Sequence, residues 1–202
     1  HYPQTAINAT MVTHARQGRC VARLKGGDPS LFGRLGEELA ALRSASIDFE
    51  IVPGITAALA SAAEAAIPLT DRNAASSVLF LSGHTCAQNV QPDWEAAVHS
   101  GGTIALYMPG NCAAVADRLM RAGMRGDTPC AIVVNATRPT GEIHRTKLEE
   151  IANIPIGRSP KLMIIGEVAR VPQMRSDTWS QSDSVFKRSL TYAVATPYSI
   201  SA

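Results

Sequence analysis

Apolar residues in the first third of the chain recur with two different spacings. Three segments have helical spacing, in which residues three and four positions apart share a face. Between them lie two short, mostly apolar runs, which are typical of buried strands. The predicted helices are residues 5–17, 32–44 and 55–66, and the predicted strands are residues 20–24 and 49–52. Because strand and helix alternate, we expect parallel strands joined by crossover helices.

The alternation stops at a polar stretch, residues 68–76, and then starts again. The second part contains predicted strands at 77–81, 103–108, 131–135, 142–146 and 162–168, and predicted helices at 94–100, 113–122 and 147–154. After Pro172, serine, threonine and glutamine dominate without a clear period. We therefore predict one α/β lobe over residues 1–75, a second over residues 76–172, and an extension of unknown role over residues 173–202.

Composition narrows the possible classes of protein. The 202 residues are 46% hydrophobic and 18% charged, which suits a globular protein with a core. A net charge of +2 is too small to indicate a nucleic-acid partner. No apolar run approaches the ~20 residues of a membrane span. The cysteines lack metal-ligand spacing, so we predict reduced thiols, a cytoplasmic location and no metal site. They are Cys20, Cys86, Cys112 and Cys130, of which the first and last stand in apolar patterns typical of strands.

The first candidate site is the turn Gly26-Gly27-Asp28-Pro29, which follows the predicted strand 20–24. Paired glycines let the backbone turn sharply and approach a ligand closely. Asp28 is expected to cap the helix that begins here, and Pro29 suits the first helical position. Tight turns without ligands use the same residues, so a purely structural turn stays an alternative.

Three further turns follow predicted strands, at residues 53–58, 107–110 and 135–139. Thr56 can cap the next helix or bind a ligand through its hydroxyl. Met108 is interpreted as a core residue or as a contact for a flat apolar ligand, the core being the more usual place for methionine. We expect all four turns at carboxyl ends of strands, the edge where open α/β sheets bind ligands.

Basic residues flank these turns, and they are either surface charge or partners for substrate carboxylates. They are Arg23, Lys25, Arg34, Arg72 and Arg138. His84 follows the predicted strand 77–81, and a lone histidine is most often structural or solvated. The sequence has no Gly-x-Ser-x-Gly elbow, Walker phosphate loop or Gly-x-Gly-x-x-Gly fingerprint, which argues against a nicotinamide dinucleotide.

Six runs of residues carry a family resemblance. They are, in order, RLKGGDPSLFGRLGEEL, VPGITAALASAAEAAIPLTDR, SGH, YMPG, VVNATRP and SPKLMIIGEV. Together they closely resemble the uroporphyrinogen-III C-methyltransferases of the tetrapyrrole methylase superfamily, which form the methylating half of sirohaem synthase. The likeness covers residues 1–171. The runs Phe32-Gly33-Arg34 and Pro68-Leu69-Thr70-x-Arg72 are most similar to the uroporphyrinogen-III branch.

The resemblance implies a two-lobed fold, each lobe a mostly parallel or mixed sheet flanked by helices, with S-adenosylmethionine between the lobes. It implies methylation of uroporphyrinogen III to precorrin-2, S-adenosylhomocysteine as a product and a homodimer. The implied cofactor contacts are Gly26, Gly27, Asp28, Leu31, Thr56, Ala57, Met108 and Ala136. The substrate carries eight carboxylates, and its candidate contacts are Arg23, Lys25, Arg34, Arg72 and His84. Three residues depart from the usual pattern: Ala136 stands for a glycine, Leu35 for another glycine and Asp71 for a histidine.

Family members begin with a Gly-Pro-Gly-Asp-Pro turn, an aspartate assigned as general base and a Val-Gly-Lys segment whose lysine is the proton donor. This chain begins at His1-Tyr2-Pro3-Gln4, which resembles a later segment. We therefore expect an incomplete N-terminal lobe, no catalytic residue in this chain, and either a fragment of a longer protein or an inactive copy. The alternatives are a non-catalytic cofactor-binding or interaction protein and a methyltransferase for a later precorrin.

Overall fold

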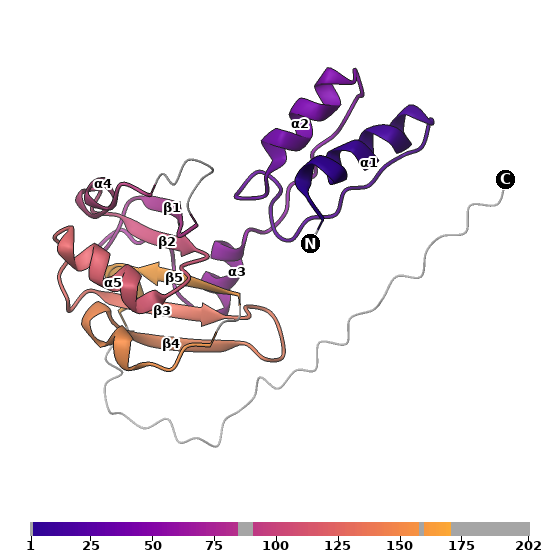
Figure 1. The fold of residues 1–202 in the computed structure, drawn as a ribbon. Helices are drawn as coiled ribbons and strands as arrows, with labels where there is room; N and C mark the ends of the chain where they lie inside the picture. The colour runs from indigo at the N-terminus through magenta and orange to yellow at the C-terminus, as the bar shows by residue number, and fades with distance from the viewer. Residues whose placement is uncertain (1, 85–90, 158–159, 171–202) are drawn as a thin grey trace. The chain divides into compact units, whose positions relative to one another are not determined.

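The computed structural model describes residues 2–84, 91–157 and 160–170, and these include a five-stranded sheet (Figure 1). The strands are β1 (Val78–Ser82), β2 (Thr103–Tyr107), β3 (Pro129–Val134), β4 (Glu142–Lys147) and β5 (Lys161–Ile165). Their order is β1-β2-β5-β3-β4. Strands β1 and β2 are parallel, whereas β5 is antiparallel to β2 and β3, and β4 is antiparallel to β3. The carboxyl ends of β1, β2 and β3 therefore share one edge of a mixed sheet.

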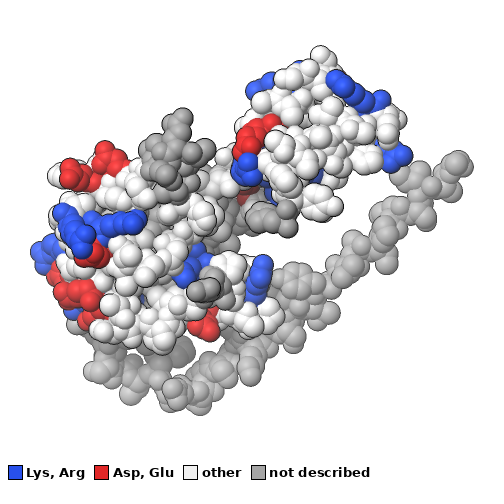
Figure 2. Space-filling model, in the orientation of Figure 1, with Lys and Arg blue, Asp and Glu red and all other residues white. Residues whose placement is uncertain are grey.

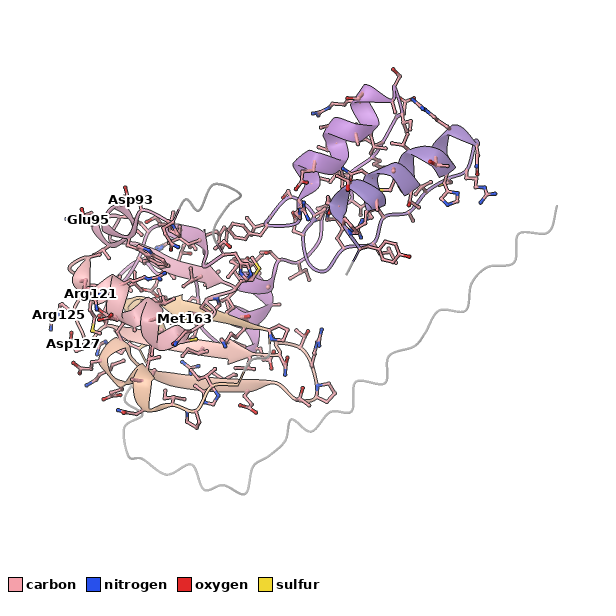
Figure 3. All side chains as sticks on the ribbon, viewed as in Figure 1. Asp93, Glu95, Arg121, Arg125, Asp127 and Met163 are labelled. Atoms are coloured by element: carbon pink, nitrogen blue, oxygen red, sulfur yellow. The ribbon has the colours of Figure 1, made fainter. Side chains whose placement is uncertain are left out.

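Strand β5 is buried on both faces, as its continuous apolar sequence requires. Met163, labelled in Figure 3, and Ile165 belong to the core on one face, and Leu162 and Ile164 to the core on the other. The first face is covered by α4 (Trp94–His99), α5 (Cys112–Arg121) and the 3₁₀ helix η1 (Leu148–Asn153). The second is covered by α3 (Ala57–Glu64) and the 3₁₀ helix η2 (Glu167–Ala169).

The prediction of two strands in the first part of the chain is wrong. Residues 20–24 and 49–52 have no regular secondary structure, and no ladder pairs them with another strand among the described residues. Apolar periodicity favours a strand, yet a strand also needs a neighbour for its backbone hydrogen bonds. Cys20, Leu24 and Val52 are accordingly exposed, in contrast to the burial that we predicted for a parallel sheet.

The helices of the first part are confirmed, with one later start. They are α1 (Gln4–Arg16) and α2 (Leu35–Ser44), which pack together, and α3 within the predicted 55–66. Helix α2 was expected from residue 32, but Phe32 and Arg34 have φ angles of 52° and 56°. These left-handed conformations are incompatible with a right-handed helix, so the helix begins only at Leu35.

In the second part the predicted helices and strands are confirmed with small shifts. The predicted strand 162–168 is too long, because Gly166 has a φ of +134° and the chain turns there into η2. The predicted helix 147–154 is the 3₁₀ helix η1. Helices α4 and α5 start at side-chain caps, where Asp93 and Asn111 accept from backbone N–H groups at 2.9 and 3.2 Å.

Residues 1–171 form one unit by their contacts, and the lobe boundary at residues 75 and 76 stays a prediction. The predicted extension, residues 173–202, lies outside the described residues. Within the described part of the chain, every helix is too short or too polar to cross a membrane.

Candidate functional site

The two glycine turns of the first part contact each other directly. The Gly54 N–H donates to Asp28 Oδ2 at 3.0 Å. A Cβ added at Gly54 would lie 2.5 Å from the Gly27 carbonyl oxygen, so only glycine permits this approach. Gly27 itself has a φ of +80°, which glycine adopts without strain. The turns at 26–29 and 53–54 therefore form one backbone-lined surface.

Asp28 does not cap a helix, contrary to the prediction. Its Oδ1 accepts from the backbone N–H of Ser30 at 2.9 Å and also from the Ser30 hydroxyl, while Oδ2 accepts from Gly54. The hydrogen bond from the Ser30 hydroxyl, followed by those from the Gly54 and Ser30 N–H groups, lowers the pKa of Asp28. The carboxylate is thus held anionic and ties the two turns together.

Thr56 occupies the N-cap position of α3, but its hydroxyl does not cap the helix. Instead, its Oγ1 lies 2.6 Å from the hydroxyl oxygen of Tyr107, at the end of β2. The same Tyr107 oxygen accepts from the N–H of Ala58 at 3.1 Å. A tyrosine from the sheet thus satisfies an N-terminal donor of α3, the Ala58 N–H, in place of a side-chain cap from Thr56.

Met108 is not a core residue, because 40% of its surface is exposed. It follows Tyr107 directly and has a left-handed backbone, with φ 48°. The neighbouring turn after β1 lies close by: Gly83 donates to the Tyr107 carbonyl at 2.8 Å, and a Cβ at Gly83 would lie 2.6 Å from the Met108 carbonyl oxygen. The open position leaves the Met108 side chain available to a ligand.

The turn after β3 carries Ala136 between two left-handed residues, Asn135 (φ 50°) and Thr137 (φ 66°). A β-branched residue in this conformation is a clear outlier. The N–H of Thr137 donates to the carboxylate of Glu64, near the end of α3. Strained backbone of this kind concentrates at ligand sites, and the other outliers at such turns are Phe32, Arg34 and Met108.

The structure brings several predicted cofactor residues together. Gly27 lies against residues 55–57, since an added Cβ there would be 3.5 Å from the Ile55 carbonyl oxygen. Leu31 and Ala136 both pack on the apolar cluster that contains Tyr107. The expectation that all four turns end strands is wrong, because only the turns at 107–110 and 135–139 follow strands of the sheet.

Most of the predicted substrate residues have partners within the chain. Arg23 and Lys25 both bind the buried carboxylate of Glu38, at 3.1 and 2.6 Å. Burial opposes ionisation of Glu38, but the hydrogen bonds from Lys25 and Gln4 outweigh it and lower the pKa. Arg34 pairs with the exposed Glu37 at 2.7 Å. The two others, Arg72 and His84, are exposed.

Sequence reasoning missed three residues that organise this region: Glu38, Glu64 and Tyr107. The burial of Glu38 could have been predicted, because it lies three positions after Leu35 and next to Leu39, on the apolar side of α2. Tyr107 lies in the turn 107–110, which the sequence analysis identified, but only Met108 of that turn was predicted to contact a ligand. The role of Glu64 could not be predicted from the sequence, because its hydrogen-bond partner Thr137 is 73 residues away.

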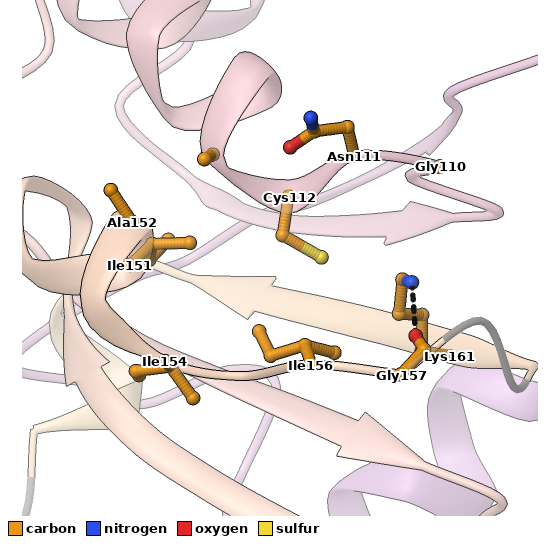
Figure 4. Close-up of a pocket in the computed structure, with 10 residues that line it drawn as sticks. Gly110, Asn111, Cys112, Ile151, Ala152, Ile154, Ile156, Gly157 and Lys161 are labelled. Carbon is orange, nitrogen blue, oxygen red and sulfur yellow. Dashed lines mark hydrogen bonds between the residues drawn. The ribbon is translucent and has the colours of Figure 1, made fainter.

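The described residues line several hollows, of which two are considered for a site. One, of about 1060 Å³, is bounded by α1, α2 and the two unpaired segments, and its lining includes Gly27, Pro29 and Gly54. The other, of about 740 Å³, lies at the start of α5 beside Cys112 and Lys161 (Figure 4). Burial raises the pKa of the Cys112 thiol, which keeps it protonated and unreactive at neutral pH. Lys161 donates to the Gly157 carbonyl at 2.8 Å. The first hollow therefore adjoins the glycine turns, whereas the second offers no activated group.

Charges on the face shown in Figure 2 are interspersed in sign. Near α5, Arg121 binds Asp117 at 2.6 Å and Arg125 binds Asp127 at 2.7 Å; three of these four residues are labelled in Figure 3. Among the described residues, no group of three or more His, Cys, Asp or Glu side chains has the geometry of a metal site. The chemistry of the region thus centres on backbone turns rather than on a charged patch or a metal cluster.

A five-stranded mixed sheet with helices on both faces defines an α/β protein. A family model for tetrapyrrole (corrin/porphyrin) methylases matches residues 2–152. The chain belongs to this family.

Individual relatives give more detail. The chain is 41% identical over 184 residues to a siroheme synthase from Tolumonas auensis, covering 90% of this chain and 39% of that protein. It thus spans about two fifths of the length of this curated relative. Among solved structures, the chain resembles a uroporphyrin-III C-methyl transferase from Thermus thermophilus, crystallised in complex with S-adenosylhomocysteine. The two chains are 36% identical in sequence and superpose with a TM-score of 0.73, which covers 83% of this chain and 74% of that chain. A cobalt precorrin-4 methyltransferase is 28% identical with a TM-score of 0.71, covering 82% and 71%.

Proposed function

We propose that this chain binds S-adenosylmethionine and serves in the C-methylation of uroporphyrinogen III to precorrin-2. The observation that carries the proposal is the contact between the turns at 26–29 and 53–57, with Tyr107 and Met108 beside them. These turns contain most of the residues that the family resemblance assigns to the cofactor, namely Gly26, Gly27, Asp28, Thr56 and Ala57, and Met108 is another. The relative from Thermus thermophilus, whose structure contains S-adenosylhomocysteine, supports the same ligand.

The residues present fit this cofactor. A Cβ built at Gly26 would meet no atom within 4 Å, so the backbone there is open to a ligand. The anionic Asp28 suits a molecule that carries a sulfonium and an ammonium charge. Met108 offers a polarizable apolar surface to a flat ring. The residues proposed to hold the cofactor are Gly26, Gly27, Asp28, Leu31, Thr56, Ala57, Met108 and Ala136.

Bound S-adenosylmethionine supplies an electrophilic methyl group. The part of this chain is to hold the cofactor and substrate in line, and such positioning can supply ~7–11 kcal/mol of barrier reduction. The exposed side chains of Arg34, Arg72 and His84 are proposed to meet substrate carboxylates. Arg23 and Lys25 are proposed for the same role, but they share the Glu38 carboxylate, so their charge toward a substrate is reduced. A homodimer is proposed from the family alone.

Titration calorimetry with S-adenosylhomocysteine tests the binding step on the full chain. A methylation assay on uroporphyrinogen III, read by product mass, then tests the chemistry. We expect binding, and product with added methyl groups, when any further segments of the natural protein are present. Binding without turnover in that setting would favour the non-catalytic alternative. Turnover only on a later precorrin would favour the class of the cobalt precorrin-4 methyltransferase. No binding at all would refute the proposal.

A further inference from the structure

Tyr107 is buried at the end of β2, and none of the roles above assigns it a function in the site. Only 8% of its surface is exposed to solvent, and it belongs to the apolar cluster between the sheet and α3. A buried phenol needs a partner for its hydroxyl. Here the hydroxyl has two, the Thr56 hydroxyl at 2.6 Å and the Ala58 N–H at 3.1 Å.

These two contacts place the start of α3. The Ala58 N–H is a donor, so the Tyr107 oxygen accepts from it. Thr56 and Ala58 flank Ala57 in the sequence. The Tyr107 hydroxyl oxygen contacts both of them, so it fixes the backbone on either side of Ala57. Because the Thr56 side chain makes no cap of its own, the orientation of this backbone depends on Tyr107.

The ring of Tyr107 reaches a second loop. Its centroid lies 4.8 Å from that of Phe32, with an angle of 57° between the planes, and 6.1 Å from that of Phe80. Phe32 belongs to the loop that follows the Gly26-Gly27 turn and has a left-handed backbone. Tyr107 also precedes the left-handed Met108, and its carbonyl accepts from Gly83. One residue thus touches all the loops around the proposed cofactor site except the one with Ala136.

We propose that Tyr107 is a positioning residue that holds Thr56, Ala57 and the Phe32 loop in the arrangement that binds the cofactor. The inference rests on the proposed function, because it assigns Tyr107 to the same site. Tyr107 acts through the hydroxyl and backbone that it orients.

The test compares S-adenosylhomocysteine affinity by calorimetry in the full chain. Tyr107→Phe keeps the ring contacts and removes the hydroxyl. Since one hydrogen bond is worth about fivefold in an equilibrium constant, we expect the Kd to rise about five- to tenfold. Tyr2→Phe is the matched control, because Tyr2 is 80% exposed, and its Kd should equal that of the wild type.

A double-mutant cycle separates positioning from general loss of stability. If Tyr107 acts through Thr56, then Tyr107→Phe costs less affinity in a Thr56→Val background than in the wild type. Thr56→Ser, which keeps a hydroxyl, should retain wild-type affinity within about twofold. Fully additive effects, or an unchanged Kd in Tyr107→Phe, would overturn the positioning role and leave the proposed function intact. Failure of the wild-type chain to bind would overturn both.

If Tyr107→Phe does not fold, hydrogen exchange in the wild type decides the question. Bound S-adenosylhomocysteine should slow exchange of the Ala58 amide by at least about tenfold, because the ligand closes the loop that this hydrogen bond anchors. Exchange at Ala58 that the ligand leaves unchanged would refute the proposal.

Discussion

Gly54 offers a sharp test of the contact between the two glycine turns. A Cβ at this position would lie 2.5 Å from the Gly27 carbonyl oxygen and 3.1 Å from its carbon. Ordinary contact begins at 3.4 Å, so Gly54→Ala must move the turns apart by about 0.9 Å. The obstacle is backbone rather than the end of a flexible side chain, and it cannot turn aside.

The displacement has two consequences. The hydrogen bond from the Gly54 N–H to Asp28, now 3.0 Å, is stretched beyond a useful length. Overpacking of this kind costs about 1–3 kcal/mol, which lowers the melting temperature by about 2–12 °C in a chain of this size. Because these turns are proposed to hold the cofactor, a cost of about 1.4–2.8 kcal/mol in the bound state corresponds to a loss of about ten- to hundredfold in S-adenosylhomocysteine affinity, and we expect a loss of this size.

The assay is thermal denaturation together with calorimetric titration of the full chain. Gly36→Ala is the matched control, because Gly36 lies in α2 and a Cβ there meets no atom within 4 Å. This control should gain about 0.5–1 kcal/mol from helix propensity and keep its affinity. The reasoning is refuted if Gly54→Ala melts and binds like the wild type.

Two further predictions concern carboxylates. NMR titration of Asp28 should give a pKa below the ordinary value of 3.8, and Ser30→Ala, which removes a hydrogen bond to the carboxylate, should raise that pKa. Because the pKa is lower in the folded than in the unfolded state, the ionised carboxylate stabilises the fold above about pH 3.8. This stabilisation is lost as the pH falls through the folded-state pKa. A pKa at or above 3.8 would contradict this. Glu38→Gln leaves the largely covered ammonium of Lys25 without its anion and should cost about 3 kcal/mol in thermal denaturation. Glu37→Gln removes one partner of an exposed pair and should cost less than about 0.5 kcal/mol. Equal losses would contradict the assignment.

The periodic pattern predicted most of the elements. Helices α1, α3, α4 and α5 and all five strands lie where apolar spacing placed them, give or take a few residues. The pattern failed at residues 20–24 and 49–52, because it reports which side chains suit a strand and not whether a partner is present. It also failed between Asp28 and Arg34, where left-handed residues have no signature in hydrophobicity.

The site divides in the same way. The glycine turns were visible because Gly26, Gly27 and Gly54 interrupt the periodic segments, and glycine has a strong local preference for turns. The helix cap expected of Asp28 is wrong, and the cap that was one of the two alternatives for Thr56 is absent. Each instead bonds to a residue more than 25 positions away, Gly54 or Tyr107.

By itself the sequence determined the helices, the five strands of the second part, the positions of the turns and, through its motifs, the family. These depend on short-range periodicity and on residue types with local preferences. The tertiary structure alone decided that β5 enters the middle of the sheet, that Glu38 holds Arg23 and Lys25, and that Tyr107 anchors Thr56. Those are contacts between distant segments, which form only when the packed core brings the chain together, and no local pattern encodes them.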